Sequence, residues 1–286
     1  MTLALLLTLK LSVTVIIFGI GLDSTPGDTM RLLRRPSLLL RSLLAMYVLV
    51  PLAAFALIHL LSPSPGVQAG LLVLAVSAGA PLLPRKLLGI GDGGYIFSLV
   101  SISSVLAIVA VPLWLAVLAP QFAGLPHVAL ERVAWGLAQS FFLPLLAGML
   151  VRRLFPGFSR NVGGRLVGVA GLVLLGAGML LLVSNWHVIV EARWEGLAAL
   201  AGLIVVALAI GHTMGGPVEE ERTALAIACA TRHIGIAVLV ATSFPGPRTA
   251  AVLTVYIATS VLITLPYMRW RKRLAASPQP RQEHCP

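Results

Sequence analysis

Long apolar runs, separated by short polar or glycine- and proline-rich stretches, dominate the hydropathy pattern of this chain of 286 residues. Most runs are about as long as the roughly 20 apolar residues that a helix needs to cross a bilayer. Glycine and proline between the runs are helix-ending signals. The pattern predicts an all-α polytopic membrane protein with about nine transmembrane helices, at residues 2–21, 38–61, 66–88, 95–118, 131–151, 166–184, 196–213, 223–243 and 249–268.

The same pattern predicts one transmembrane domain over residues 1–274, with a first half of about 1–120 and a second half of about 125–274. The last residues, 275–286, are polar and contain proline, so we expect a disordered tail. The composition agrees with a membrane protein: 58% of the residues are hydrophobic, only 11% are charged, and the mean hydropathy is +0.96. A soluble domain usually carries about 25% charged residues. This composition excludes a soluble enzyme, a disordered chain and a fibrous protein.

The net charge of +11 comes from bases that cluster between apolar runs, which indicates loops facing anionic lipid rather than nucleic acid. With the N-terminus outside, sixteen bases fall on the inner side and three on the outer side: Arg132, Arg193 and Arg248. We therefore predict an integral protein of the bacterial plasma (inner) membrane with a cytoplasmic C-terminus. Two cysteines, Cys229 and Cys285, exclude a disulfide framework and a structural zinc site, and no metal site is predicted.

The third apolar run is interrupted. It contains Ser77, Gly79 and Pro81, and continues through Pro84 to Gly91–Gly94. Proline cannot donate a backbone hydrogen bond and glycine lowers helix stability, so we expect the helix to break between Gly79 and Pro84. An ordinary proline kink is the alternative interpretation.

The eighth run places Thr231, Arg232 and His233 about ten residues into an apolar stretch. An arginine at that depth costs roughly 2.5–3.5 kcal/mol, so such residues normally face a protein interior or a wet cavity. The third and eighth runs are predicted to cross in opposite senses, one in each half. Such a pair is typical of an inverted-repeat transporter with two broken, crossing helices. The alternatives for Arg232 are a buried structural ion pair and a cation that extends to the interface.

Four stretches, in order, resemble the bile acid:sodium symporter family, which belongs to a broader group with arsenite and auxin-efflux-like carriers. They are 18–28 with 34–36 and 47–51, the interrupted third run with Gly91–Asp92, the serine-rich stretch 98–104 with 111–112, and 221–237. The resemblance implies a panel domain, a core domain in which broken spans three and eight cross, and sodium-coupled uptake of an organic anion. It also implies ten helices, one more than predicted here.

The chain departs from the family at its sodium sites. The family's carboxylate falls on Ala228, its glutamine on Arg232 and its asparagine on His233. A cation in place of a ligand repels sodium, because two unit charges 4 Å apart cost about 4 kcal/mol at an effective dielectric of 20. This argues against a two-sodium mechanism. The hydroxyls of Ser101 and Ser104, with Ser98 and Ser103, are candidate ligands for one ion; a packing face is the alternative.

These observations predict a secondary active transporter of a small organic anion. Arg232 is the expected fixed positive charge, and His233 is a candidate for proton coupling because its ordinary pKa is near 6.5; a neutral, hydrogen-bonded histidine is the alternative. Na⁺ and H⁺ are the candidate coupling ions, and no other cofactor is expected. We expect no enzyme, since the common catalytic motifs are missing. Efflux of arsenite or another metabolite, for which Cys229 would supply a thiol, and a non-transporting scaffold or receptor remain alternatives. Substrate, direction and oligomeric state are not assigned.

Overall fold

A computed structural model describes residues 3–23, 27, 32–78, 93–118, 130–184, 194–232, 237 and 247–276. Within these ranges the chain is helical and contains no β-strand. The helices are α1 (Leu3–Asp23), α3 (Pro36–Leu44), the π-helix η1 (Ala45–Leu49), α4 (Val50–Leu61), α5 (Pro65–Val76), α7 (Gly93–Leu118), α8 (Leu130–Leu137), the π-helix η3 (Ala138–Phe142), α9 (Leu143–Leu154), α10 (Pro156–Ser184), α12 (Trp194–Met214), α13 (Glu219–Thr231) and α15 (Pro247–Ala276).

Helical structure occurs in every range that the hydropathy pattern predicts, and the all-α fold class is confirmed for the described residues. By length and composition, four segments are able to cross a membrane: Pro36–Leu61, Ala134–Leu154, Pro156–Leu180 and Trp194–Met214. Two shorter apolar helices, Pro65–Val76 and Val105–Val117, accompany them. The protein is therefore an integral membrane protein, whereas the number of nine spans remains a prediction.

Three helix boundaries differ clearly from the predicted ones. Helix α10 begins at Pro156 rather than 166, because proline fits the first position of a helix, where its missing N–H group is not needed. Helix α13 begins at Glu219 rather than 223, and its first turn carries three glutamates, which the positive end of the helix dipole stabilises. Helix α15 continues to Ala276, so the first two residues of the predicted tail are helical; residues 277–286 lie outside the described chain.

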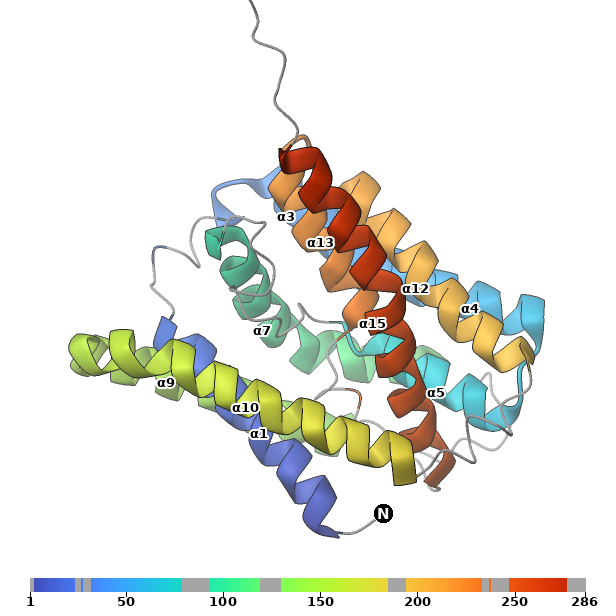
Figure 1. Ribbon diagram of the computed structural model, residues 1–286, viewed down its shortest axis with the longest axis horizontal. Helices are drawn as coiled ribbons and strands as arrows, with labels where there is room; N and C mark the ends of the chain where they lie inside the picture. The colour runs from blue at the N-terminus through green and yellow to red at the C-terminus, as the bar shows by residue number, and fades with distance from the viewer. Residues whose placement is uncertain are drawn as a thin grey trace, which may run out of the picture.

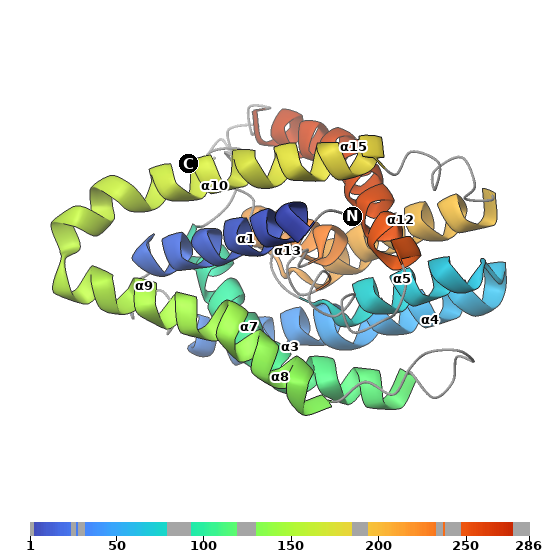
Figure 2. The same ribbon diagram turned by 90° about the horizontal axis from the view of Figure 1, so that it is seen from below.

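The helices form two groups, which Figures 1 and 2 show from perpendicular directions. In the first group α1 packs most extensively against α9 and α10, and Figure 2 shows it lying between them. In the second group α12 packs against α13 and α4, and α15 packs against α5. Most of the largest cluster of buried apolar side chains belongs to this second group, so the short helices α5 and α13 lie within the most buried part of the fold.

The first group depends on a very close approach of two helices. A Cβ atom added at Gly21 of α1 would lie 2.4 Å from the backbone oxygen of Leu145 and 2.9 Å from the Cα atom of Gly148. A Cβ atom at Gly148 would in turn lie 2.2 Å from the backbone oxygen of Phe18. Small residues of this kind let membrane helices pack backbone to backbone, where dispersion rather than hydrophobicity drives association.

Both π-helices immediately precede a proline near the start of the next helix: Pro51 follows η1, and Pro144 follows η3. A proline inside an α-helix clashes with the carbonyl group four residues earlier and lacks the N–H group that would bond to it. One wider turn relieves this conflict without ending the span. The prolines therefore account for two local distortions inside otherwise continuous apolar runs.

Candidate functional site

The two short helices end in the same way, deep inside the second group. Helix α5 ends at Val76, and the hydroxyl of the following residue, Ser77, donates to the carbonyl of Val73 at 2.5 Å. Helix α13 ends at Thr231, whose hydroxyl donates to the carbonyl of Ile227 at 2.8 Å. Hydroxyl side chains that bond back by one turn compete with the helical backbone pattern. Helix α5 thus ends before the predicted break at Gly79–Pro84, which lies outside the described residues, and α13 ends directly before Arg232.

Arg232 directly follows the end of α13 and joins it to the end of α5. Its Nε atom donates to the carbonyl of Leu74 at 3.1 Å, and Nη2 donates to the carbonyl of Ala75. Its Nη1 atom donates to the carbonyl of Met46 in η1 at 3.2 Å. The side chain is buried, with 2% of its surface exposed. One guanidinium therefore connects the end of α13 to two segments, η1 and α5, that lie more than 150 residues away in the sequence.

Local backbone geometry explains why these carbonyl groups are available. Leu74 and Ala75 belong to the last turn of α5, where carbonyl groups lose their intrahelical donors. In a regular α-helix, the carbonyls of Met46 and Tyr47 would accept from the N–H groups of the residues at positions 50 and 51. Instead, the N–H group of Val50 bonds to the carbonyl of Ala45, and proline has no N–H group. The Met46 carbonyl accepts from Arg232, and the Tyr47 carbonyl accepts from the indole of Trp114 at 2.7 Å.

The charge of Arg232 faces the negative ends of helices rather than a carboxylate. None of the ion pairs recorded between described residues involves Arg232. The C-terminal end of an α-helix carries about half a negative elementary charge, and Arg232 lies at the end of both α5 and α13. The Tyr256 hydroxyl, from α15, completes the end of α13 by donating to the carbonyl of Ala230. The alternative of a buried ion pair is therefore not seen among the described residues.

The serine-rich helix α7 contacts both α5 and α13. Ser98, Ser101 and Ser103 are buried. The Ser103 hydroxyl donates to the carbonyl of Val100 at 3.1 Å, whereas the hydroxyl of Ser101 has no hydrogen-bond partner within the described structure. A buried, unpaired hydroxyl is unusual enough to keep Ser101 a candidate ligand. The side chain of Ser104 lies outside the described part.

Several sequence candidates fall where the structure is not described. Gly79, Pro81 and His233 lie outside the described residues, and so does Asp92. The structure does bring Ser77, Thr231 and Arg232 to the ends of the two short helices. The sequence pattern did not identify the carbonyl groups of Met46, Leu74 and Ala75, because any residue type can supply a carbonyl. The available signal was Pro51 inside an apolar run, which marks backbone groups without their usual partners.

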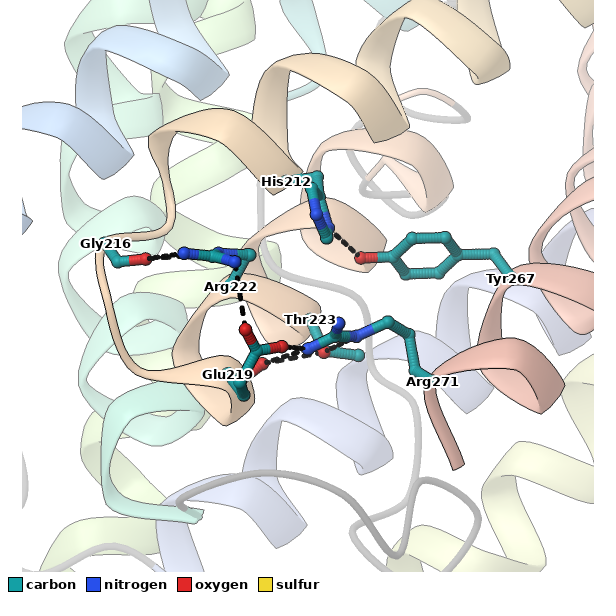
Figure 3. A network of polar contacts seen from close by, with 7 residues as sticks. All are labelled: His212, Gly216, Glu219, Arg222, Thr223, Tyr267 and Arg271. Atoms are coloured by element: carbon teal, nitrogen blue, oxygen red, sulfur yellow. Dashed lines mark hydrogen bonds and ion pairs between the residues drawn. The ribbon is translucent and has the colours of Figure 1, made fainter. Parts of the chain in front are cut away.

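A second polar network holds the start of α13 (Figure 3). Glu219 forms ion pairs with Arg222 at 3.0 Å and with Arg271 of α15, and Arg271 also donates to the Thr223 hydroxyl at 2.9 Å. Close by, His212 Nδ1 and the Tyr267 hydroxyl are 2.8 Å apart. This network ties α12, α13 and α15 together at one end of the second group.

A separate contact fixes the same turn of α13 to α3. The buried carboxylate of Glu221 accepts a hydrogen bond from Arg35 Nη1 at 2.6 Å, and Arg35 directly precedes α3. Glu221 lies in the first turn of α13. The first turn of α13 is thus bonded to residues at α3 and on α15, and Arg232 follows the last turn of the helix.

Replacing Glu219 with alanine should lower the melting temperature by about 2–4 °C, because an ion-paired carboxylate that is largely exposed contributes about 1 kcal/mol. Glu219 is 60% exposed. Glu220→Ala is the matched control, since Glu220 shares the first turn and the same helix dipole but belongs to none of the recorded ion pairs. The measurement is thermal unfolding of the purified protein in detergent. Equal shifts for the two variants would show that the network contributes nothing beyond the dipole.

Two comparisons with known proteins give consistent results. The model of a family described as "Sodium Bile acid symporter family" matches residues 10–192 of this chain. A protein of Bacillus subtilis (strain 168), named "Uncharacterized sodium-dependent transporter YocS", is 25% identical over 281 residues; the alignment covers 92% of this chain and 84% of that protein. The family match includes α5 and the carbonyl groups that Arg232 contacts, whereas Arg232 itself lies beyond the matched range.

Proposed function

We propose that this chain, which belongs to the sodium bile acid symporter family, is a secondary active transporter of a small organic anion. The observation that carries the proposal is the buried guanidinium of Arg232, placed where two interrupted helices end. A buried ionisable side chain in a membrane protein usually marks the path of a substrate or an ion. Three of its N–H groups bond to carbonyls, and none of the ion pairs recorded between described residues gives it a carboxylate partner, so its positive charge favours an anionic solute.

The order of helices supports an inverted repeat around this site. In the first half, the long segment Pro36–Leu61 is followed by the short α5 and then by α7, which contains Pro112. In the second half, the long α12 is followed by the short α13 and then by α15, which contains Pro266. The cross-contacts of α5 with α15 and of α13 with α7 also correspond. Opposed repeats that meet at broken helices are the usual basis of alternating access.

The second part of the proposal is proton coupling, with His233 as the candidate group. The proposed orientation places the C-terminus in the cytoplasm of a bacterium, with the protein in the inner membrane. An unperturbed histidine titrates in the physiological pH range and can exchange a proton during transport. Na⁺ is the competing coupling ion. An imposed pH gradient, acidic outside, should therefore drive uptake into vesicles more strongly than an imposed sodium gradient.

Uptake by proteoliposomes tests the main proposal. The purified protein is reconstituted and exposed to labelled mono- and dicarboxylates, selected first by their effect on the melting temperature. We expect saturable uptake of at least one carboxylate and no uptake of its uncharged amide, because the amide lacks the charge that Arg232 would attract. Equal uptake of acid and amide, or no difference from protein-free vesicles for any stabilising anion, contradicts the proposal.

Arsenite efflux remains the alternative within the broader group of carriers, and a scaffold or receptor the alternative outside transport. The thiol of Cys229, which the arsenite alternative requires, is fully buried on α13. Replacing Cys229 with serine should leave anion uptake within about twofold of the original rate, because serine has nearly the same size and can bond back to its own helix. A loss of arsenite resistance in cells that carry Cys229→Ser would favour the arsenite alternative.

A further inference from the structure

The surroundings of Arg232 are those of a bound cation. Its three recorded acceptors are backbone carbonyl oxygens, from Leu74, Ala75 and Met46. Backbone carbonyls are among the oxygen ligands that proteins use for hard cations, which are held by several oxygens from separate segments. Here the cation in the middle of the oxygens is a side chain.

The dipoles of two helices together favour about one positive charge at this place. Two helices, α5 and α13, end beside the guanidinium, and each C-terminal end carries about half a negative charge. Water would ordinarily satisfy such ends, but Arg232 is 2% exposed. Without a cation, the carbonyl groups of two helix ends would be buried beside one another, which costs free energy for each unpaired group.

The backbone of Arg232 shows that this placement is maintained against local strain. Its φ is 45° and its ψ is 164°, a conformation that residues with a Cβ atom rarely adopt. Such conformations are strained and persist only where the surrounding contacts determine them. The unusual backbone turns the side chain from the end of α13 toward α5 and η1.

We propose that Arg232 is a positioning residue that acts as a tethered cation, taking the place of a free alkali ion where α5, η1 and α13 meet. This inference rests on the proposed function, and it means that anion transport by this chain needs no sodium. The family description, in contrast, names sodium as the coupled ion. Arg232 fixes the distance between the helix ends and offsets their partial negative charges, as a bound ion would otherwise do.

Chemical rescue tests this role in the purified protein. Arg232→Ala should lower the melting temperature, and low-millimolar guanidinium chloride should recover part of the loss, because the free cation can occupy the carbonyl-lined space. Choline chloride at the same ionic strength should recover none. Arg269→Ala, which removes an exposed arginine of α15, should melt like the original protein and show no guanidinium effect. A folded Arg232→Ala protein that guanidinium does not stabilise more than choline overturns the proposal.

The original protein provides a test that does not depend on the folding of any variant. Its melting temperature and its anion uptake should be the same in sodium chloride and in choline chloride. Anion uptake that requires sodium overturns the tethered-cation role and leaves the proposed function intact. If no anion is taken up, the proposed function fails, while the guanidinium experiment and the sodium-insensitive melting temperature still decide the role of Arg232.

Discussion

Replacing Arg232 with methionine is expected to reduce anion uptake by about tenfold or more and to lower the melting temperature. Methionine approximates the length of arginine but has neither its charge nor its donors. Three buried carbonyl groups then lose a partner, and each unpaired buried group costs about 1–3 kcal/mol. The positive charge between the ends of α5 and α13 is lost as well. Initial rates of uptake in proteoliposomes and thermal unfolding in detergent measure the two effects.

Two further variants separate the causes of this loss. Arg232→Lys keeps a positive charge and N–H donors but lacks the planar fork, so it should lose less than Arg232→Met in both measurements. Arg269→Met removes an exposed arginine from α15 and should match the original protein. Uptake by Arg232→Met at the original rate would remove this residue from the transport mechanism, whatever happens to the stability.

Replacing Gly148 with leucine should have the largest effect on folding of any single change in the first helix group. A Cβ atom at this position would lie 2.2 Å from the backbone oxygen of Phe18 and 2.8 Å from the Cα atom of Gly21. Both neighbours are backbone atoms, which cannot rotate away as the end of a side chain can. The helices α1 and α9 would have to separate, and overpacking of this kind costs about 3 kcal/mol or more. The yield of monodisperse protein and its melting temperature measure the effect.

Gly164→Leu is the matched control for this prediction. Gly164 lies on α10, and an added Cβ atom there meets nothing within 4 Å. Leucine at this position should be tolerated, because the helix already presents apolar side chains on its exposed face and leucine favours a helix more than glycine does. Comparable losses for Gly148→Leu and Gly164→Leu would mean that the crossing of α1 and α9 is not what the glycine protects.

The family description names sodium, whereas the proposed site of this chain contains a cationic side chain of its own. The family is described by sodium symport, and the Bacillus relative is named a sodium-dependent transporter. In this chain a permanent cation lies among carbonyl oxygens at the meeting of the two interrupted helices. The sodium dependence of the relative is therefore a property to be tested in this protein, with Arg232 as the residue whose removal is most informative.

The sequence alone determined the class of the protein and the approximate place of each helix. Apolar runs, helix-ending prolines and glycines, and acids at a helix start are local features, and the free energy of placing a residue in lipid depends mainly on that residue. The sequence predicted an interruption in each of two runs, between Gly79 and Pro84 and around Arg232; helix α5 ends earlier, at Val76, and α13 ends at Thr231. The family resemblance rested on the order of four such stretches along the chain. It is confirmed by the match of the family model over residues 10–192.

Only the tertiary structure decided what Arg232 contacts. Its carbonyl partners on Leu74 and Met46 lie 158 and 186 residues away along the chain. A carbonyl oxygen belongs to every residue and leaves no mark in the sequence; it becomes a partner only when a helix ends or a π-turn removes its usual donor. The close approach at Gly21 and Gly148, and the ion pair between Glu219 and Arg271, depend likewise on which helices are neighbours in space. Local chemistry placed the helices, and the packing of distant segments decided which buried groups satisfy one another.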